Sequence, residues 1–493
     1  MFRKVLIANR GEIAVRILRT CREMGLSTVS LYQAADRGSL HVRLADECVL
    51  LESPEGFQDQ QAILRIAQEK GADAIHPGYG FLAERQDFIQ ACEAQGIVFI
   101  GPPSQVVDTL TNKVEVLKRA RAAGFPTAEF SSASYDLLDV KALRAEAEQL
   151  GYPVLIKSAR GGRGRGSRLA WSSDHLLKTV RQAQRESLVI YGNTRVYLEK
   201  AILPAHQIGV QVVGDREGAL VHLGEREGSL LYGNQKIVEE APAPGLTQPQ
   251  RQHIWQAALE LARLFGYENV GTVEFLVDLQ GNFYFTEIKP RIQIEHPLTE
   301  ALTQVDLVSQ QIRIAAGQPL NLCQDDIRLN GWALLGRISA KDPWQRFMPS
   351  PGYLRQVRLP GGQGVRVDTY LYCGCTIPSE YDPLIAKLIV WGQDRPAAVQ
   401  RMQRALQEFQ LVGAANNLPM IQRILTQSDF VQGEYIKGAS ASALGRLPES
   451  EEHFRRLALA AALVYVRRNQ MSDPLLPDRL VSGWHRHSRR LPQ

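Results

Sequence analysis

The ten residues from Glu287 to His296 constrain this chain more than any other stretch. From Glu287 to Glu295 the sequence alternates strictly between polar and apolar residues. Successive side chains of an extended strand point to opposite faces, so the polar residues of this run would share one face. They are Glu287, Lys289, Arg291, Gln293 and Glu295. Because a straight strand would hold the two glutamates roughly 26 Å apart, we expect either a bend near Pro290 or two separate sites.

The polar face of this run has two interpretations. A polar strand face is more often a solvated outer surface than a functional site. This one combines two carboxylates with a guanidinium and an amide. Such a set suits binding an anion and moving a proton, which favours a functional site.

Short apolar strands and an amphipathic helix alternate at the start of the chain. Residues 4–9 and 28–32 have the composition of strands, and the residues from Ile13 to Cys21 have helical spacing. A strand, a helix and a second strand joined by short links predict a parallel, Rossmann-like sheet. The first strand is not followed by the Gly-x-Gly-x-x-Gly dinucleotide fingerprint, which argues against a nicotinamide enzyme.

A glycine-dense loop at residues 160–167 follows a predicted strand that ends near Lys157. Such a loop is either a flexible connector or a phosphate cradle. The arginines within it and the lysine before it favour anion binding. Further along, residues 271–277 and 282–285 predict a hairpin around Gln280-Gly281, which would place Glu274 and Glu287 on neighbouring strands.

Bulk properties exclude several classes of protein. The chain has 493 residues, enough for about three domains. Its net charge of +5 is compatible with anionic substrates such as nucleotides and does not call for nucleic acid. The six cysteines are scattered, so we expect no disulfide framework. Neither a signal peptide nor an apolar run of membrane-spanning length is evident, so we expect a cytoplasmic protein.

Several motifs carry a resemblance to a known family. The run from Glu287 to His296 is similar to the Glu-x-Asn-x-Arg-x-Gln-x-Glu-His segment of biotin carboxylases, which are ATP-grasp ligases. The same resemblance is carried by residues 5–14, 35–37, 76–82, 235–244 and 381–389, and it reaches from Val5 to about residue 446.

The resemblance implies an α/β fold with several parts. They are a Rossmann-like N-terminal domain at 1–112, an ATP-grasp domain at 113–325 with a lid at about 126–201, a β-rich C-terminal domain at 326–446, and a C-terminal helix with a basic tail at 447–493.

The resemblance also implies an activity, because biotin carboxylases make carboxybiotin from bicarbonate, ATP and carrier-bound biotin. Matching positions imply ATP contacts from Lys113, Lys157, Gly161, Gly162, Gly164, Glu199, Lys200, Ile202 and Leu276. Glu274 and Glu287 would hold magnesium or manganese, and Arg291, Gln293 and Ile294 would seat bicarbonate. The catalytic set would be Glu295 as the base, Arg291, Lys236 to stabilise carboxyphosphate, and Arg337 to stabilise the biotin enolate, with Asp382 nearby.

The chemistry of this reaction fits these residue types. Phosphoryl transfer to bicarbonate brings several negative charges together, so lysines, an arginine and divalent metals must offset them. Glu295 beside Arg291 would keep a low pKa and stay ionised, as a base must.

The departures from the family pattern cluster around ATP and metal. Lys289 stands where the family has a metal-binding asparagine. A lysine ammonium has no acceptor, so it cannot coordinate a cation, but it could take the metal's place as a salt bridge to Glu274 or Glu287. Other departures are Arg160 and Arg163 for lid glycines, Gln207, Leu231 and Asn234 for nucleotide-side polar residues, Gly209 for a glutamate and Gly228 for a cysteine.

These departures leave alternatives open. The chain is either a biotin carboxylase of an acetyl-CoA or acyl-CoA carboxylase, with a role in fatty acid metabolism, or a pseudo-carboxylase that acts as a binding or regulatory subunit. Another ATP-grasp ligase is a third alternative, which the retained Arg291, Glu295 and Arg337 disfavour. No Met-Lys-Met biotin site is present, so biotin would come on a separate carrier protein. A carboxyltransferase subunit and a second copy of the chain are the other expected partners.

Overall fold

The computed structural model describes residues 1–493 except 137–138, 161–166, 233–234, 435–450 and 471–493. It divides into a first unit of residues 1–445 and a second unit of residues 446–493. The predicted ATP contacts Gly161, Gly162 and Gly164 and the departures Arg163 and Asn234 lie outside the described residues.

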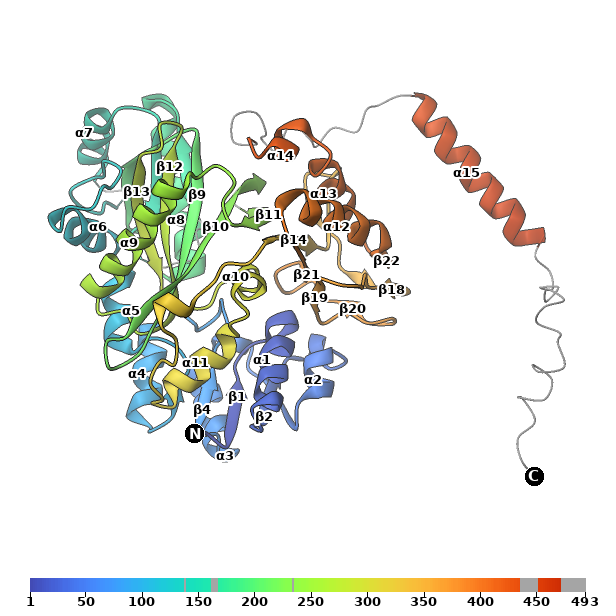
Figure 1. The fold of residues 1–493 in the computed structure, drawn as a ribbon, viewed down its shortest axis with the longest axis horizontal. Helices are drawn as coiled ribbons and strands as arrows, with labels where there is room; N and C mark the ends of the chain where they lie inside the picture. Colours follow the sequence, from blue (N-terminus) through green and yellow to red (C-terminus); the bar gives the residue numbers. More distant parts are fainter. Residues whose placement is uncertain (137–138, 161–166, 233–234, 435–450, 471–493) are drawn as a thin grey trace. The chain divides into compact units, whose positions relative to one another are not determined.

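A parallel sheet of five strands forms the start of the first unit, in the order β3-β2-β1-β4-β5 (Figure 1). The strands are β1 (Lys4–Ile7), β2 (Ser27–Tyr32), β3 (Glu47–Leu50), β4 (Ala74–His76) and β5 (Val98–Phe99). The helices of this region are α1 (Gly11–Glu23), α2 (Leu40–Leu44), α3 (Gln60–Glu69), α4 (Gln86–Ala94) and α5 (Ser104–Thr111). All four strand pairings are parallel, which confirms the predicted Rossmann-like start.

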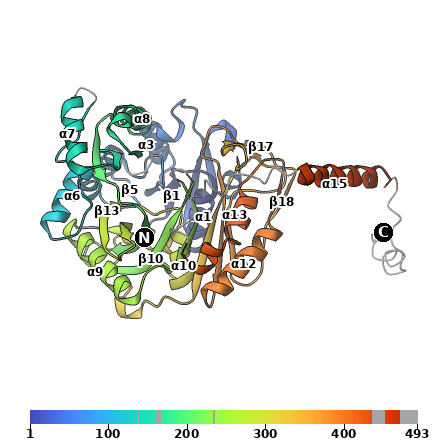
Figure 2. The same ribbon diagram turned by 90° about the horizontal axis from the view of Figure 1, so that it is seen from above.

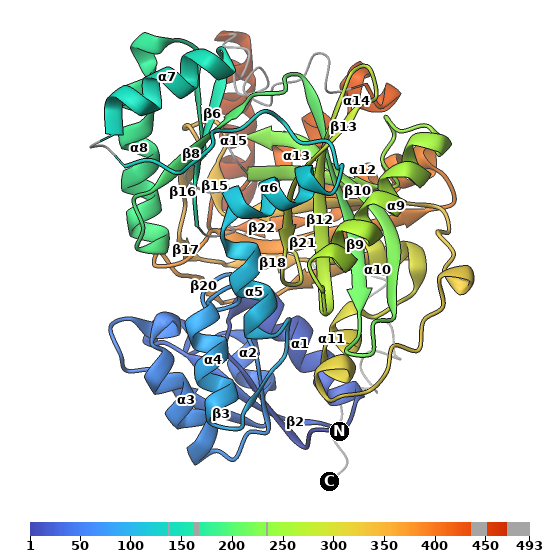
Figure 3. The ribbon, with the colours of Figure 1, turned by 90° about the vertical axis from the view of Figure 1, so that its left-hand side faces the viewer.

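A compact α/β subdomain follows α6 (Lys113–Ala122). Its sheet has the order β7-β6-β8, with β6 (Val154–Ser158), β7 (Arg168–Ala170) and β8 (Val196–Lys200). Figure 3 shows α7 (Val140–Leu150) and α8 (Ser173–Tyr191) beside these strands. Apolar residues from the helices and strands, such as Leu143, Ile156 and Val180, form a separate small core. This subdomain lies within the segment predicted as the lid.

An antiparallel sheet of eight strands runs through the rest of the first unit, in the order β13-β12-β9-β10-β11-β14-β21-β19. Its strands are β9 (Ala205–Gly214), β10 (Leu220–Tyr232), β11 (Gln235–Ala241), β12 (Asn269–Asp278), β13 (Phe283–Lys289), β14 (Trp332–Ser339), β19 (Val365–Thr369) and β21 (Leu384–Gly392). The pairing of β11 with β14 joins the part predicted as ATP-grasp to the part predicted as C-terminal domain. The helices α9 (Gln248–Leu264), α10 (His296–Thr303) and α11 (Leu307–Ala315) pack against this sheet.

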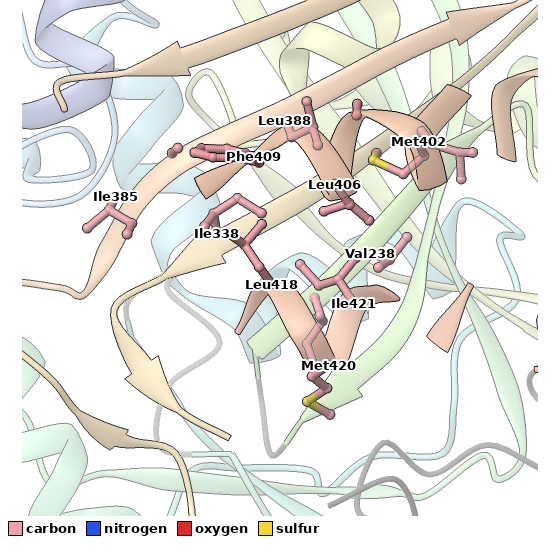
Figure 4. Packing of buried hydrophobic residues seen from close by; sticks show 14 of the residues in the cluster. Val238, Ile338, Ile385, Leu388, Met402, Leu406, Phe409, Leu418, Met420 and Ile421 are labelled. Atoms are coloured by element: carbon pink, nitrogen blue, oxygen red, sulfur yellow. The ribbon is translucent and has the colours of Figure 1, made fainter. Parts of the chain in front are cut away.

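The C-terminal part of the first unit encloses a large apolar core. Figure 2 shows α12 (Arg395–Glu408) and α13 (Leu418–Ile424) side by side, with α14 (Ser428–Gln432) following in the chain. Figure 4 shows Leu388 of β21, Leu406 of α12 and Ile421 of α13 packed together. Short strands complete this region: β15 (Lys341–Asp342), β16 (Met348–Pro349), β17 (Gly352–Tyr353), β18 (Gln356–Arg358), β20 (Thr376–Ile377) and β22 (Gln410–Val412). The predicted β-rich character of this region is confirmed.

The described part of the second unit is one helix, α15 (Glu451–Gln470). It agrees with the C-terminal helix expected within residues 447–493. Among the described residues, no helix combines the length and the apolar character needed to cross a membrane.

Candidate active site

The polar run from Glu287 to Glu295 is divided by a turn. Strand β13 ends at Lys289, which is the last residue paired with β12, opposite Thr272. Proline has no N–H to donate to a strand ladder, and after Pro290 the N–H of Arg291 donates to the Lys289 carbonyl at 2.9 Å. The structure therefore has the bend at Pro290, which was one of the two alternatives. Glu295 takes the N-cap position of α10, and its side chain makes no capping hydrogen bond there.

Glu295 lies between two cations. Lys236 Nζ is 2.7 Å from Glu295 Oε1, and Arg337 Nη2 donates to Glu295 Oε2 at 3.0 Å. The same two cations also hold Glu239, with Lys236 Nζ 3.1 Å from its Oε1 and Arg337 Nε 2.8 Å from its Oε2. Both carboxylates are buried. The arrangement is an alternating cluster of two acids and two bases, which satisfies charges that could not be buried singly.

These four residues come from three separate parts of the chain. Strand β11 supplies Lys236 and Glu239, its neighbour β14 supplies Arg337, and the turn before α10 supplies Glu295. Of the expected catalytic set, Glu295, Lys236 and Arg337 are brought together, whereas Arg291 forms its ion pair with Glu84. Glu239 was not among the predicted site residues, although it stands in the motif at residues 235–244 that carried the resemblance.

The pKa of Glu295 is low, as expected, but for a different reason. Burial by itself would raise this pKa, and the positive charges of Lys236, Arg337 and Arg226 outweigh burial and hold it well below the usual value. Arg291, the residue expected to do this, forms its ion pair elsewhere: its Nε lies 2.5 Å from Glu84 Oε1. Glu84 was missed, although it stands two residues after the motif at residues 76–82.

A buried arginine orients the amide of Gln293. Arg226 is 3% exposed, and its Nη2 donates to Gln293 Oε1 at 2.8 Å. The amide nitrogen of Gln293 in turn donates to Glu274 Oε1 at 2.7 Å. Arg226 also donates to Gln211, Thr272 and Thr299. Sequence reasoning missed Arg226, because no local pattern marks an arginine on a buried strand face.

A second charged cluster gathers the predicted ATP and metal residues. Lys157 Nζ is 2.8 Å from Glu199 Oε2, and Lys113 Nζ is 3.4 Å from Glu287 Oε2. Lys289 Nζ is 2.7 Å from Glu287 Oε1. The expected salt bridge of Lys289 is therefore confirmed, with Glu287 as the partner.

The remaining predicted residues take varied positions. Lys200 Nζ donates to the carbonyls of Gly151 and Tyr152, at 2.8 and 2.9 Å. Ile202 and Leu276 are half-buried, and so is Ile294. Burial lowers the pKa of Arg337, but Glu239 and Glu295, with a smaller contribution from Asp382, more than offset it, which places the charge of Asp382 near this site.

A small cleft opens beside the alternating cluster. Its lining residues are Gln235, Lys236, Ile237, Arg337, Ser339, Lys341, Phe347 and Asn417. A larger pocket in the described part of the chain is lined by residues such as His222, Trp255 and Arg328, and it contains none of the predicted site residues. Of these two hollows, only the cleft lined by Lys236 and Arg337 includes residues of the charged cluster around Glu295, so it is the candidate substrate site.

Three family models match consecutive parts of the chain. "Biotin carboxylase, N-terminal domain" matches residues 1–107, "Carbamoyl-phosphate synthase L chain, ATP binding domain" matches residues 112–323, and "Biotin carboxylase C-terminal domain" matches residues 336–438.

Similar proteins cover most of the chain. The biotin carboxylase of Nostoc is 44% identical over 88% of this chain and 97% of its own length. The propionyl-CoA carboxylase alpha chain of Ruegeria pomeroyi is 39% identical over 96% of this chain and 74% of its own length. Among solved structures, the biotin carboxylase domain dimer of Hydrogenobacter thermophilus 2-oxoglutarate carboxylase has a TM-score of 0.87 and 40% identity, and covers 91% of this chain and 100% of that one. That structure is a complex with MgADP, ADP and bicarbonate.

Proposed function

Since this chain belongs to the biotin carboxylase family, we propose that it is an ATP-dependent ligase that carboxylates biotin with bicarbonate. One observation carries the proposal for this chain: an ionised, buried carboxylate, Glu295, lies between Lys236 and Arg337, and these two cations line a cleft. A carboxylate that stays ionised is suited to accept a proton, and two adjacent cations are suited to stabilise the anion that results.

The proton transfer follows from this geometry. Bicarbonate binds near Arg291, Gln293 and Ile294, and its O–H proton passes to the carboxylate of Glu295. The deprotonated oxygen then attacks the terminal phosphorus of ATP, forming an O–P bond while the bond to the ADP oxygen breaks. Lys236 stabilises the carboxyphosphate, and Arg337, with Asp382 nearby, stabilises the enolate of biotin. The carboxyl carbon then forms a bond to the biotin nitrogen while its bond to the phosphate oxygen breaks, and the phosphate that leaves takes up the biotin N–H proton. The cation positions around Glu295 support these assignments.

The second charged cluster provides the proposed nucleotide site. Lys113, Lys157 and Glu199 line it in the described part of the chain, and we keep Lys200, Ile202, Leu276, Gly161, Gly162 and Gly164 as further proposed ATP contacts. The support is that three lysines gather beside the lid segment and face the end of β13. Cationic side chains there would offset the charge of a polyphosphate.

The partners follow from the relatives. We propose that biotin arrives on a separate carrier protein, and that a carboxyltransferase subunit then uses carboxybiotin to carboxylate an acyl-CoA. Relatives named propionyl-CoA and methylcrotonoyl-CoA carboxylase alpha subunits support the acyl-CoA class, and the dimeric relative supports a homodimer. A cytoplasmic location, and the domain boundaries at residues 112, 325 and 446, are part of the same proposal.

A second candidate function rests on Glu287. Its two carboxylate oxygens lie 2.7 Å from Lys289 Nζ and 3.4 Å from Lys113 Nζ. If these lysines keep a metal ion away from Glu287, the chain would bind bicarbonate and the biotin carrier without turning over ATP. Its role would then be that of a regulatory subunit.

One assay separates the two functions. Bicarbonate-dependent ATP hydrolysis is measured with free biotin, in magnesium and in manganese, for the full chain and for Glu295→Gln. A carboxylase hydrolyses ATP when bicarbonate is present, and Glu295→Gln loses this activity while it still binds ADP, because the change removes the base and no nucleotide contact. The exposed Glu260→Gln, on α9, is the matched control. A protein that binds ADP but shows no bicarbonate-dependent hydrolysis supports the regulatory subunit.

A further inference from the structure

The two carboxylates proposed as metal ligands do not fit a divalent cation in this structure. Glu287 contacts ammonium groups at both of its oxygens, and Glu274 accepts a hydrogen bond from the amide of Gln293 at 2.7 Å. Among the described residues, no group of three or more histidine, cysteine, aspartate or glutamate side chains could hold a metal ion. A magnesium site needs oxygen ligands in near-octahedral geometry, and an ammonium supplies none.

Strand register explains why a cation is needed at this place. Glu274 of β12 is paired in register with Glu287 of β13. Like charges directly opposite each other on neighbouring strands repel. Lys289 follows Glu287 by two residues, so it shares its face of β13, and its ammonium is 2.7 Å from Glu287. The chain therefore supplies its own positive charge where two carboxylates meet.

We propose that Lys289 is the resident counter-cation of the nucleotide site, so that a nucleoside diphosphate or triphosphate binds without a divalent cation between Glu274 and Glu287. This inference rests on the proposed nucleotide site. The ammonium of Lys289 supplies the positive charge that a bound divalent cation would otherwise supply.

The charges of the cluster support this assignment. The ammonium groups of Lys113, Lys157 and Lys289 balance the carboxylates of Glu199, Glu287 and the adjacent Glu274. With asparagine at position 289, the same cluster would carry one net negative charge. A polyphosphate that enters the cluster therefore avoids an excess negative charge only because residue 289 is a lysine.

The ion pair between Lys289 and Glu287 is largely shielded from water, with the side chain of Glu287 only 19% exposed. Lys289 itself is 7% exposed. A metal ion could reach Glu287 Oε1 only by displacing a buried ammonium from its carboxylate, which is costly because the displaced charge has to find another partner or reach water.

Binding of ADP to the full chain tests the proposal. Calorimetry compares the ADP affinity in EDTA with that in magnesium for the wild type, Lys289→Asn, Lys289→Arg and the control Lys118→Asn, which removes an exposed lysine from α6. We expect the wild type, Lys289→Arg and Lys118→Asn to change by less than about two-fold between the two conditions. Lys289→Asn should lose about ten-fold in EDTA and recover in magnesium.

A metal titration gives an independent readout. Binding of Mn²⁺ followed by electron paramagnetic resonance should detect a bound ion in Lys289→Asn that is absent from the wild type and from Lys118→Asn. Thermal unfolding confirms that each variant is folded.

The outcomes separate this inference from the proposed function. ADP binding by the wild type that requires magnesium, or equal Mn²⁺ binding by the wild type and Lys289→Asn, overturns the role of Lys289 and leaves the nucleotide site in place. No ADP binding by any folded variant in either condition overturns the nucleotide site itself.

Discussion

Replacing Arg226 by methionine tests how the bicarbonate side of the site is held in place. The guanidinium donates to Gln211, Thr272, Thr299 and Gln293, at 2.6–2.9 Å. Methionine has a similar length but no donor, so Arg226→Met leaves four buried acceptors without this partner. A buried polar group left unpaired costs about 1–3 kcal/mol. We therefore expect a local loss of at least about 4 kcal/mol.

Two measurements follow from that magnitude. The midpoint of thermal unfolding should fall by about 8–16 °C, since each kcal/mol shifts the midpoint of a domain of about 150–250 residues by about 2–4 °C. The KM for bicarbonate should rise about ten-fold, because Gln293 loses the group that orients its amide and misplaced binding groups lose affinity. The affinity for ADP should change much less.

The exposed Arg263 of α9 provides the matched control. Arg263→Met removes the same charge and shape from the surface, where a substitution usually changes stability by less than about 0.5 kcal/mol. If Arg226→Met and Arg263→Met have the same unfolding midpoint and the same KM for bicarbonate, then Arg226 does not hold Gln293 and this reasoning is wrong.

Three further predictions concern single residues. Glu84→Gln should raise the KM for bicarbonate about ten-fold with little effect on ADP binding, because the 2.5 Å ion pair that positions Arg291 is weakened; an unchanged KM contradicts this role. Gly228→Cys should change bicarbonate-dependent hydrolysis by less than about two-fold, because a Cβ atom there would lie 2.6 Å from Lys236 Cε, the flexible end of a side chain that can shift; a loss of about ten-fold in this variant would show that Lys236 cannot move without consequence. Burial lowers the pKa of His222 to about 4, so the folded state keeps it neutral while the unfolded chain takes up a proton below about pH 6.5. Stability should thus be lost as the pH falls from about 6.5 towards 4, by up to about 1.4 kcal/mol per pH unit for this group. In His222→Phe the unfolding midpoint should depend less steeply on pH over that range, and an identical pH profile counts against the assignment.

Local patterns were enough to predict elements whose parts are close together in the sequence. The strands near residues 4–9 and 28–32 and the helix between them are observed as β1, β2 and α1. The hairpin around Gln280-Gly281 is observed as β12 and β13, and it pairs Glu274 with Glu287. In each case the turn is short, so the periodicity of a few residues decides the geometry.

The bend at Pro290 shows the limit of such patterns. Alternation of polar and apolar residues predicts a shared strand face, but it continues from Glu287 to Glu295 although the strand ends at Lys289. The proline indicated the place of the break. Where the chain goes after the break depends on the packing of α10 against β14, which no local pattern contains.

By itself, the sequence determined the family, the candidate site residues and the fact that Lys289 cannot be a metal ligand, because these follow from residue types in a given order. Only the tertiary structure decided the partners of those residues. Arg291 pairs with Glu84, 207 positions away, and Lys236 and Arg337 are held by Glu239 as well as by Glu295. Lys289 forms an ion pair with Glu287, while the amide of Gln293 donates a hydrogen bond to the nearby Glu274. The physical reason is that charge pairing is set by distances of a few ångströms, and those distances come from how strands far apart in the chain are stacked.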